Sequence, residues 1–123
     1  MNAIFVKNIW KENRAITKKD LINEKFDCDI FINEIKLLDN LKVNQENNIT
    51  YVFSKIYTDL SYMFHNCSSL NSINLYNFNA NNVTNMSCMF HGCSSLTLIN
   101  LSNFKTDNVT NMSSIFDGCS SMT

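Results

Sequence analysis

Apolar residues return in this chain every 26 residues, and polar residues fill most of the positions between them. Phenylalanine shows this spacing at Phe64, Phe90 and Phe116, and a cysteine follows three residues later in each copy. A period of about 20 to 50 residues is typical of proteins that stack one supersecondary unit on the next. The pattern therefore predicts a repeat architecture whose fold follows from one unit.

Within one unit the apolar spacing changes from a strand pattern to a helix pattern. The strand is predicted at Leu96–Phe104, where apolar and polar residues alternate before the phenylalanine. The helix is predicted where apolar residues fall at positions i, i+3, i+4 and i+7. In the middle copy these residues are Met86, Met89, Phe90 and Cys93.

Polar residues and glycines predict where each helix begins and ends. A Thr or Asn before the apolar face can act as the N-cap, because its side-chain oxygen accepts hydrogen bonds from free backbone amides. The candidate caps are Thr84, Asn85, Thr110 and Asn111. The two glycines of the chain, Gly92 and Gly118, and Asn66 in the first copy are residues that tolerate a left-handed backbone at a helix end.

The predicted unit is therefore a strand, a turn and a short helix. Stacked units would pair their strands in parallel about 4.8 Å apart over one continuous core. The predicted fold class is an α/β repeat, a short leucine-rich-repeat-like solenoid over residues 57–123, with an N-terminal β-hairpin cap.

The wording of the repeat resembles one protein family. The text Asn-Val-Thr-Asn-Met-Ser, followed by Met-Phe-x-x-Cys-Ser-Ser-Leu, resembles the units of the BspA-like leucine-rich-repeat surface proteins. The similarity covers about residues 58–123, roughly half of the chain. What the resemblance implies is an adhesion-type scaffold without catalysis, at the cell surface or outside the cell.

Residues 1–27 form the first predicted segment, which carries no copy of the repeat. A strand is predicted from Ala3 to Trp10. A short helix is predicted after Thr17, running about eight residues, because Asp20 three residues later can complete a capping box.

Residues 28–56 form the second predicted segment, and they predict two β-hairpins. The first hairpin turns at Asn33-Glu34, and the second turns at residues 44–48 before the strand Ile49–Phe53. We expect this segment to be the hairpin cap that covers the open edge of the first repeat strand.

Charge and hydropathy exclude two classes of partner. The chain has 10 basic and 11 acidic residues and a net charge of −1, so it lacks the basic field that nucleic acid requires. No run approaches the roughly 20 apolar residues of a membrane span, so membrane insertion is not expected. No signal peptide is visible, since the apolar run Ala3–Val6 ends at Lys7 and a secretory segment needs about 7 to 15 apolar residues.

Histidine and cysteine recur together, which raises metal binding and nucleophilic catalysis as alternatives. His65 and Cys67 are two residues apart, as are His91 and Cys93, and these are zinc-compatible residue types. The cysteines, however, are predicted to point inward just after the Gly or Asn turn and the histidines to lie at the outer end of the helix, while the third copy has Asp117 in place of histidine. We therefore expect no metal, no cofactor, no catalytic residue and no enzymatic activity.

The predicted functional feature is a surface. Residues that alternate with the core positions of the repeat strands should point outward and form a candidate binding face. These residues are Asn74, Tyr76, Leu98, Asn100 and Ser102. We expect this face to bind a protein or a glycan, and the alternative is a purely structural spacer with no binding site of its own.

The last copy stops where the next strand would begin. The sequence therefore predicts a truncated repeat array in which Leu96–Phe104 has an unpaired edge. The expected consequence is either fraying of the last predicted helix or edge-to-edge self-association.

Overall fold

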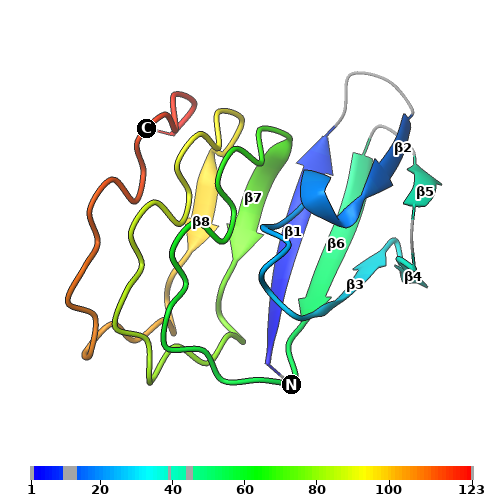
Figure 1. Cartoon of the computed structure of the whole chain (residues 1–123). Helices are drawn as coiled ribbons and strands as arrows, with labels where there is room; N and C mark the ends of the chain where they lie inside the picture. The colour runs from blue at the N-terminus through cyan, green and yellow to red at the C-terminus, as the bar shows by residue number, and fades with distance from the viewer. Residues whose placement is uncertain (1, 10–13, 39, 44–45, 123) are drawn as a thin grey trace.

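The computed structural model describes residues 2–9, 14–38, 40–43 and 46–122 and consists mainly of strands and turns (Figure 1). Six strands form one open mixed sheet in the order β4-β3-β6-β1-β7-β8. Their bounds are β1 Ala3–Ile9, β3 Asp29–Ile32, β4 Ile35–Lys36, β6 Glu46–Val52, β7 Leu70–Asn74 and β8 Leu98–Asn100. A separate two-stranded sheet pairs β2 (Arg14–Thr17) with β5 (Asn40–Val43).

The strand β1 joins the N-terminal part of the chain to the repeats. It pairs antiparallel with β6 on one side and with β7 on the other, so that Val6 lies opposite both Ile49 and Ile73. The predicted hairpin cap is therefore wrong, because the strand beside the first repeat strand is β1 rather than part of residues 28–56. The strand predicted from Ala3 is confirmed to Ile9, and Trp10 lies outside the described residues.

One of the two predicted hairpins forms. Strands β3 and β4 pair across Asn33 and Glu34, whose φ angles of 49° and 72° match the two left-handed positions of a type I′ turn. The second hairpin is wrong, because β5 pairs with β2 and β6 pairs with β1 and β3. Strand β6 pairs with β1 along the whole length of β1, which a short hairpin partner could not match.

The helix predicted after Thr17 is reduced to a single 3₁₀ turn, Lys18–Asp20. Its predicted start is confirmed, since the Thr17 amide donates to Asp20 Oδ2 at 2.9 Å. The helix does not continue because the Asn23 amide donates to the carbonyl of Met63 at 2.8 Å instead of to its own turn.

The repeats contain no helix, so the predicted α/β repeat, a leucine-rich-repeat-like solenoid with a helix in each unit, is wrong. Within the described residues the segments 58–69, 84–95 and 110–121 run as consecutive turns, and no α-helix is present. The middle of each segment has a left-handed residue, Tyr62, Cys88 or Ser114, with φ of 61°, 55° and 55°. A right-handed helix cannot pass through such a residue.

Backbone hydrogen bonds between copies replace the helical ones. Every second amide donates to a carbonyl 25 residues later, as Leu60 does to Asn85 at 2.8 Å and Phe64 does to Met89 at 2.8 Å. The donors in the first two copies are Leu60, Tyr62, Phe64, Asn66, Met86, Cys88, Phe90 and Gly92. The copies thus lie as parallel layers joined by main-chain bonds, visible as three aligned loops in Figure 1.

The predicted core positions are confirmed although the helix is not. Met86, Met89, Phe90 and Cys93 are all buried. Phe90 lies between its two counterparts, with ring centroids 5.9 Å from Phe64 and 5.6 Å from Phe116. Phe116 itself is 40% exposed, because no further layer covers it within the described residues.

Candidate binding face

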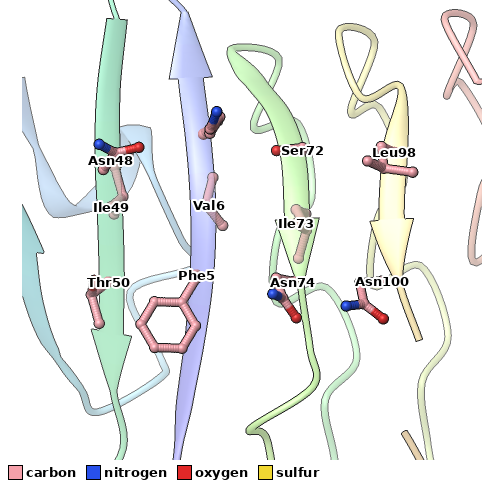
Figure 2. Close-up of a pocket in the computed structure, with 11 residues that line it drawn as sticks. Phe5, Val6, Asn48, Ile49, Thr50, Ser72, Ile73, Asn74, Leu98 and Asn100 are labelled. Carbon is pink, nitrogen blue, oxygen red and sulfur yellow. The ribbon is translucent and has the colours of Figure 1, made fainter. Parts of the chain in front are cut away.

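The outward face of the sheet carries the candidate site. Strands alternate their side chains, and Val6, Ile49 and Ile73 are buried on the core side. Their neighbours along each strand therefore point to the other side, on the adjacent strands β6, β1, β7 and β8 (Figure 2). The outward residues are Phe5 and Lys7 of β1, Asn48 and Thr50 of β6, Ser72 and Asn74 of β7, and Leu98 and Asn100 of β8.

These eight residues line an open depression of about 420 Å³, which we call the outer hollow. Its apolar surface comes from the ring of Phe5 and from Leu98, which is 65% exposed. Amides and hydroxyls surround them, and Lys7 is the one formally charged side chain among the lining residues. The hollow therefore combines apolar contact area with neutral hydrogen-bonding groups.

Asn74 and Asn100 each use the side-chain oxygen for a local turn and leave the side-chain nitrogen for a ligand. The Oδ1 atom of Asn74 accepts the Tyr76 amide at 2.9 Å, and that of Asn100 accepts the Ser102 amide at 3.0 Å. These local bonds end the strands, as Asn side chains commonly do at turns. Since the oxygens are used locally, the groups available to a ligand are the Nδ2 donors.

The structure brings together three of the five predicted site residues. Asn74, Leu98 and Asn100 line the outer hollow. Tyr76 is half-exposed and lines a second, more polar depression of about 310 Å³ beside it, and Ser102 lies in the turn after β8.

Five of the eight outward residues of the hollow were missed from the sequence, and one of them, Ser72, lies on the repeat strand β7. Phe5, Lys7, Asn48 and Thr50 come from β1 and β6, which lie outside the repeats. The alternation in residues 3–9 and 46–52 indicates which of their side chains share a face. It does not indicate that β1 pairs with β7.

The thiols of Cys93 and Cys119 in the repeat have a structural role, because each donates a hydrogen bond to the backbone of the preceding copy. The Cys93 thiol donates to the Phe64 carbonyl at 3.1 Å, and the Cys119 thiol donates to the Phe90 carbonyl at 3.1 Å. Burial raises the pKa of Cys67 to about 12 and also raises the pKa of Cys93. A thiol that stays protonated at neutral pH is a poor nucleophile and a poor metal ligand.

The two histidines stack on each other at 5.0 Å between ring centroids. In the described part of the chain, no group of three or more His, Cys, Asp or Glu residues could hold a metal ion. A search of the same residues finds no helix long and apolar enough to cross a membrane.

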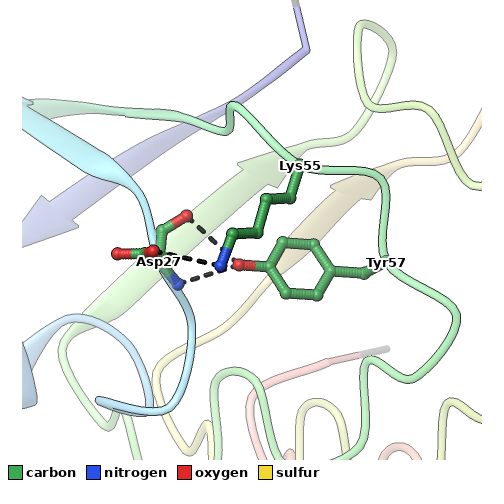
Figure 3. A network of polar contacts seen from close by, with 3 residues as sticks. All are labelled: Asp27, Lys55 and Tyr57. Carbon is green, nitrogen blue, oxygen red and sulfur yellow. Dashed lines mark hydrogen bonds and ion pairs between the residues drawn. The ribbon is translucent and has the colours of Figure 1, made fainter.

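A polar cluster of Asp27, Lys55 and Tyr57 lies at the junction between the N-terminal part of the chain and the first repeat (Figure 3). Lys55 Nζ lies 3.3 Å from Asp27 Oδ2, and the Tyr57 hydroxyl accepts the Asp27 amide at 2.9 Å. The Tyr57 ring packs against Phe26 and Phe53 at 5.3 and 6.0 Å between centroids. Because the ion pair is exposed, the ring packing contributes more to this junction than the charges do.

Comparison with known proteins identifies a family. A family model described as "Mycoplasma protein of unknown function, DUF285" matches residues 36–123. The match covers more than half of the chain, and the chain belongs to this family. Searches of curated proteins and of solved structures found no match.

Proposed function

We propose that this member of the DUF285 family is a non-catalytic binding module that holds a protein partner in its outer hollow. The observation that carries the proposal is that Phe5 of β1 and Leu98 of β8, with β7 between them, both face the hollow from a sheet whose other face is already buried. Phe5 and Leu98 lie on the outward face, so neither side chain is needed for the buried core on the opposite face of the sheet. An exposed apolar patch with a polar rim is typical of interaction sites.

The chemistry of the hollow favours a protein over a charged ligand. Leu98 and Phe5 supply apolar area at the centre, and the Nδ2 groups of Asn74 and Asn100 can donate to main-chain carbonyls of a partner. With Lys7 as the one charged lining residue, affinity should depend weakly on salt. The affinity of a partner bound mainly through ion pairs would instead fall steeply as the salt concentration rises.

The finer proposal is that the module is of the BspA-like surface-protein type, with an adhesion role at the cell surface. The repeat text Asn-Val-Thr-Asn-Met-Ser, with Met-Phe-x-x-Cys-Ser-Ser-Leu, supports this assignment. The raised pKa values of Cys67 and Cys93 support a role without catalysis.

The test is a selection of peptides from a random library on the full chain, followed by NMR mapping of the selected ligands. We expect shift changes at Phe5, Leu98 and Asn100. Leu98→Ser should weaken binding at least about tenfold without changing the circular dichroism spectrum, since the side chain is mostly exposed. Leu38→Ser is the matched control, because Leu38 is 87% exposed and is not among the residues lining the hollow.

Two other outcomes would replace the proposal. Ligands that map to the hollow only from a glycan array, with no peptide selected, would make the partner a glycan. No ligand of either class at the hollow would favour the structural spacer, whose support is that equivalent main-chain hydrogen bonds join each layer to the next.

A further inference from the structure

The turns that follow β7 and β8 form a second depression, which we call the polar depression. The two strands run parallel, so these turns lie side by side at the same end of the sheet (Figure 1). The polar depression has a volume of about 310 Å³ and is lined by residues 76–81 of one copy and by Asn103 and Lys105 of the next. It shares no lining residue with the outer hollow, so the two are separate sites.

The ring of Tyr76 is the aromatic surface of the polar depression, and it is 50% exposed. Its backbone is held on both sides, because its amide donates to Asn74 Oδ1 at 2.9 Å and its carbonyl accepts from Asn103 Nδ2 at 3.1 Å. The equivalent position of the next copy is Ser102, which has no ring to stack on it. The repeat therefore places one aromatic ring here and leaves half of its surface open.

Two asparagine side chains in the polar depression have their orientations set by local hydrogen bonds. Asn79 Oδ1 accepts the Asn81 amide at 3.0 Å, which leaves its Nδ2 group as a donor for a ligand. Asn103 Nδ2 donates to the carbonyl of Tyr76, which leaves its Oδ1 atom as an acceptor. The depression thus offers one donor and one acceptor in addition to the ring.

These groups match a sugar ring better than a protein side chain. A sugar ring has an apolar face of C–H groups, which can stack on an aromatic ring, and its hydroxyls both donate and accept hydrogen bonds. A protein anchor would require more apolar area than Tyr76 supplies, because Phe78 and Ala80 are each only 3% exposed. Lys105 is the one formally charged lining residue and adds a further donor.

We propose that the polar depression binds a saccharide, with one sugar ring stacked on Tyr76. A hydroxyl oxygen of the sugar accepts from Asn79 Nδ2, and another hydroxyl donates to Asn103 Oδ1. The Lys105 ammonium donates to a third oxygen, either a hydroxyl or the carboxylate of an acidic sugar. Because the site is separate from the outer hollow, the proposal does not depend on whether the hollow binds a protein.

The experiment is an NMR titration of the full chain with simple glycosides. The neutral probes are methyl β-D-glucoside, methyl β-D-galactoside and methyl α-D-mannoside, and the acidic probe is methyl β-D-glucuronide. We expect at least one of them to shift the amides of Tyr76, Asn79 and Asn103 with a Kd of about 1 mM. Sorbitol is the control, since it has the hydroxyls of a sugar but no ring face, and it should shift none of these amides.

Two matched variants test the stacking. Tyr76→Ser should weaken the glycoside at least about fivefold. Tyr62→Ser removes a ring that is 44% exposed and not among the lining residues, so it should leave the affinity unchanged. Both substitutions introduce the serine that a later copy carries at the same position, Ser102 or Ser114, so both variants should keep the circular dichroism spectrum of the parent chain.

Several results would overturn the proposal. These are the absence of shifts with all four glycosides at tens of millimolar, equal shifts with sorbitol, and shifts confined to residues outside the polar depression. Unchanged affinity in a folded Tyr76→Ser variant would do the same. Lys105→Met changes a second exposed side chain and should weaken the bound glycoside at least about twofold, and an unchanged affinity would remove the ammonium from the site.

Discussion

Phe90 is the residue whose removal should damage the stack most. It is 1% exposed, and its ring lies nearly parallel to those of Phe64 and Phe116, with interplanar angles of 12° and 6°. Replacing it with alanine leaves a cavity between two layers. Core Phe→Ala substitutions cost about 3 to 5 kcal/mol, and we expect about 4 kcal/mol here because two ring contacts are lost together.

Phe116→Ala is the matched control, because it removes the same side chain at the same repeat position. That ring is 40% exposed and stacks on one neighbour, so about 60% of a transfer free energy of roughly 1.5 to 3 kcal/mol is lost and no closed cavity forms. The expected cost is about 1 to 2 kcal/mol. The two variants should therefore differ by about 2 to 3 kcal/mol.

Urea titration followed by far-ultraviolet circular dichroism measures both costs. With a slope of about 2 kcal/mol per molar urea, Phe90→Ala should lower the midpoint by about 2 M and Phe116→Ala by less than about 1 M. Equal midpoints at equal slopes would refute the layered arrangement of the rings.

Three further predictions concern single positions. Gly92→Ala should cost about 1 to 3 kcal/mol more than Gly118→Ala. Both glycines have φ of 79°, but the new Cβ at Gly92 would overlap Asn66 Oδ1, whereas at Gly118 it would lie 3.2 Å from the Gly92 backbone, a tight contact without overlap. Equal urea midpoints would contradict this. Because burial raises the pKa of Cys67 from 9.0 to about 12, the folded state keeps the thiol protonated. The stabilisation from this thiol should be fully present below pH 9 and should be lost as pH rises toward 12, which lowers the free energy of unfolding by on the order of 2 kcal/mol at pH 10.5. In urea titrations at pH 8 and 10.5, the Cys67→Ala variant should lose less stability between the two pH values than the parent chain does. An equal loss would exclude this thiol as a cause. Asn8→Ala should cost about 1 to 3 kcal/mol in thermal or urea unfolding, because buried Asn8 donates to Ser69 Oγ and accepts from Asn47, while exposed Asn48→Ala should stay within about 0.5 kcal/mol; similar costs would remove the buried network as the reason.

The repeat period and the core positions could be predicted from the sequence, but the helices could not be excluded. Spacing of i, i+3, i+4 and i+7 marks one face of a helix, and consecutive turns that bury the same residues produce it equally well. The left-handed residues predicted at Asn66 and Gly92 are confirmed, with φ of 60° and 79°. Those that break the helix are Tyr62, Cys88 and Ser114, residue types that rarely indicate such a conformation.

The binding face was predicted only where the repeat itself supplies it. Asn74, Leu98 and Asn100 follow from strand alternation within the repeats. Phe5 and Lys7 belong to the binding face only because β1 pairs with β7, and these two segments are more than 60 residues apart in sequence. Alternation along a strand indicates which face of the sheet each side chain occupies, but it does not indicate which other strand lies beside it.

The layered fold depends on the claim that alternate amides join one layer to the next. Residue-resolved hydrogen exchange of the free chain tests this claim most directly. We predict slow exchange at the donors in residues 60–66 and 86–92 that reach the next layer, and fast exchange at residues 112, 114, 116 and 118. Continuous slow exchange across residues 112–119, as a helix would produce, would contradict it.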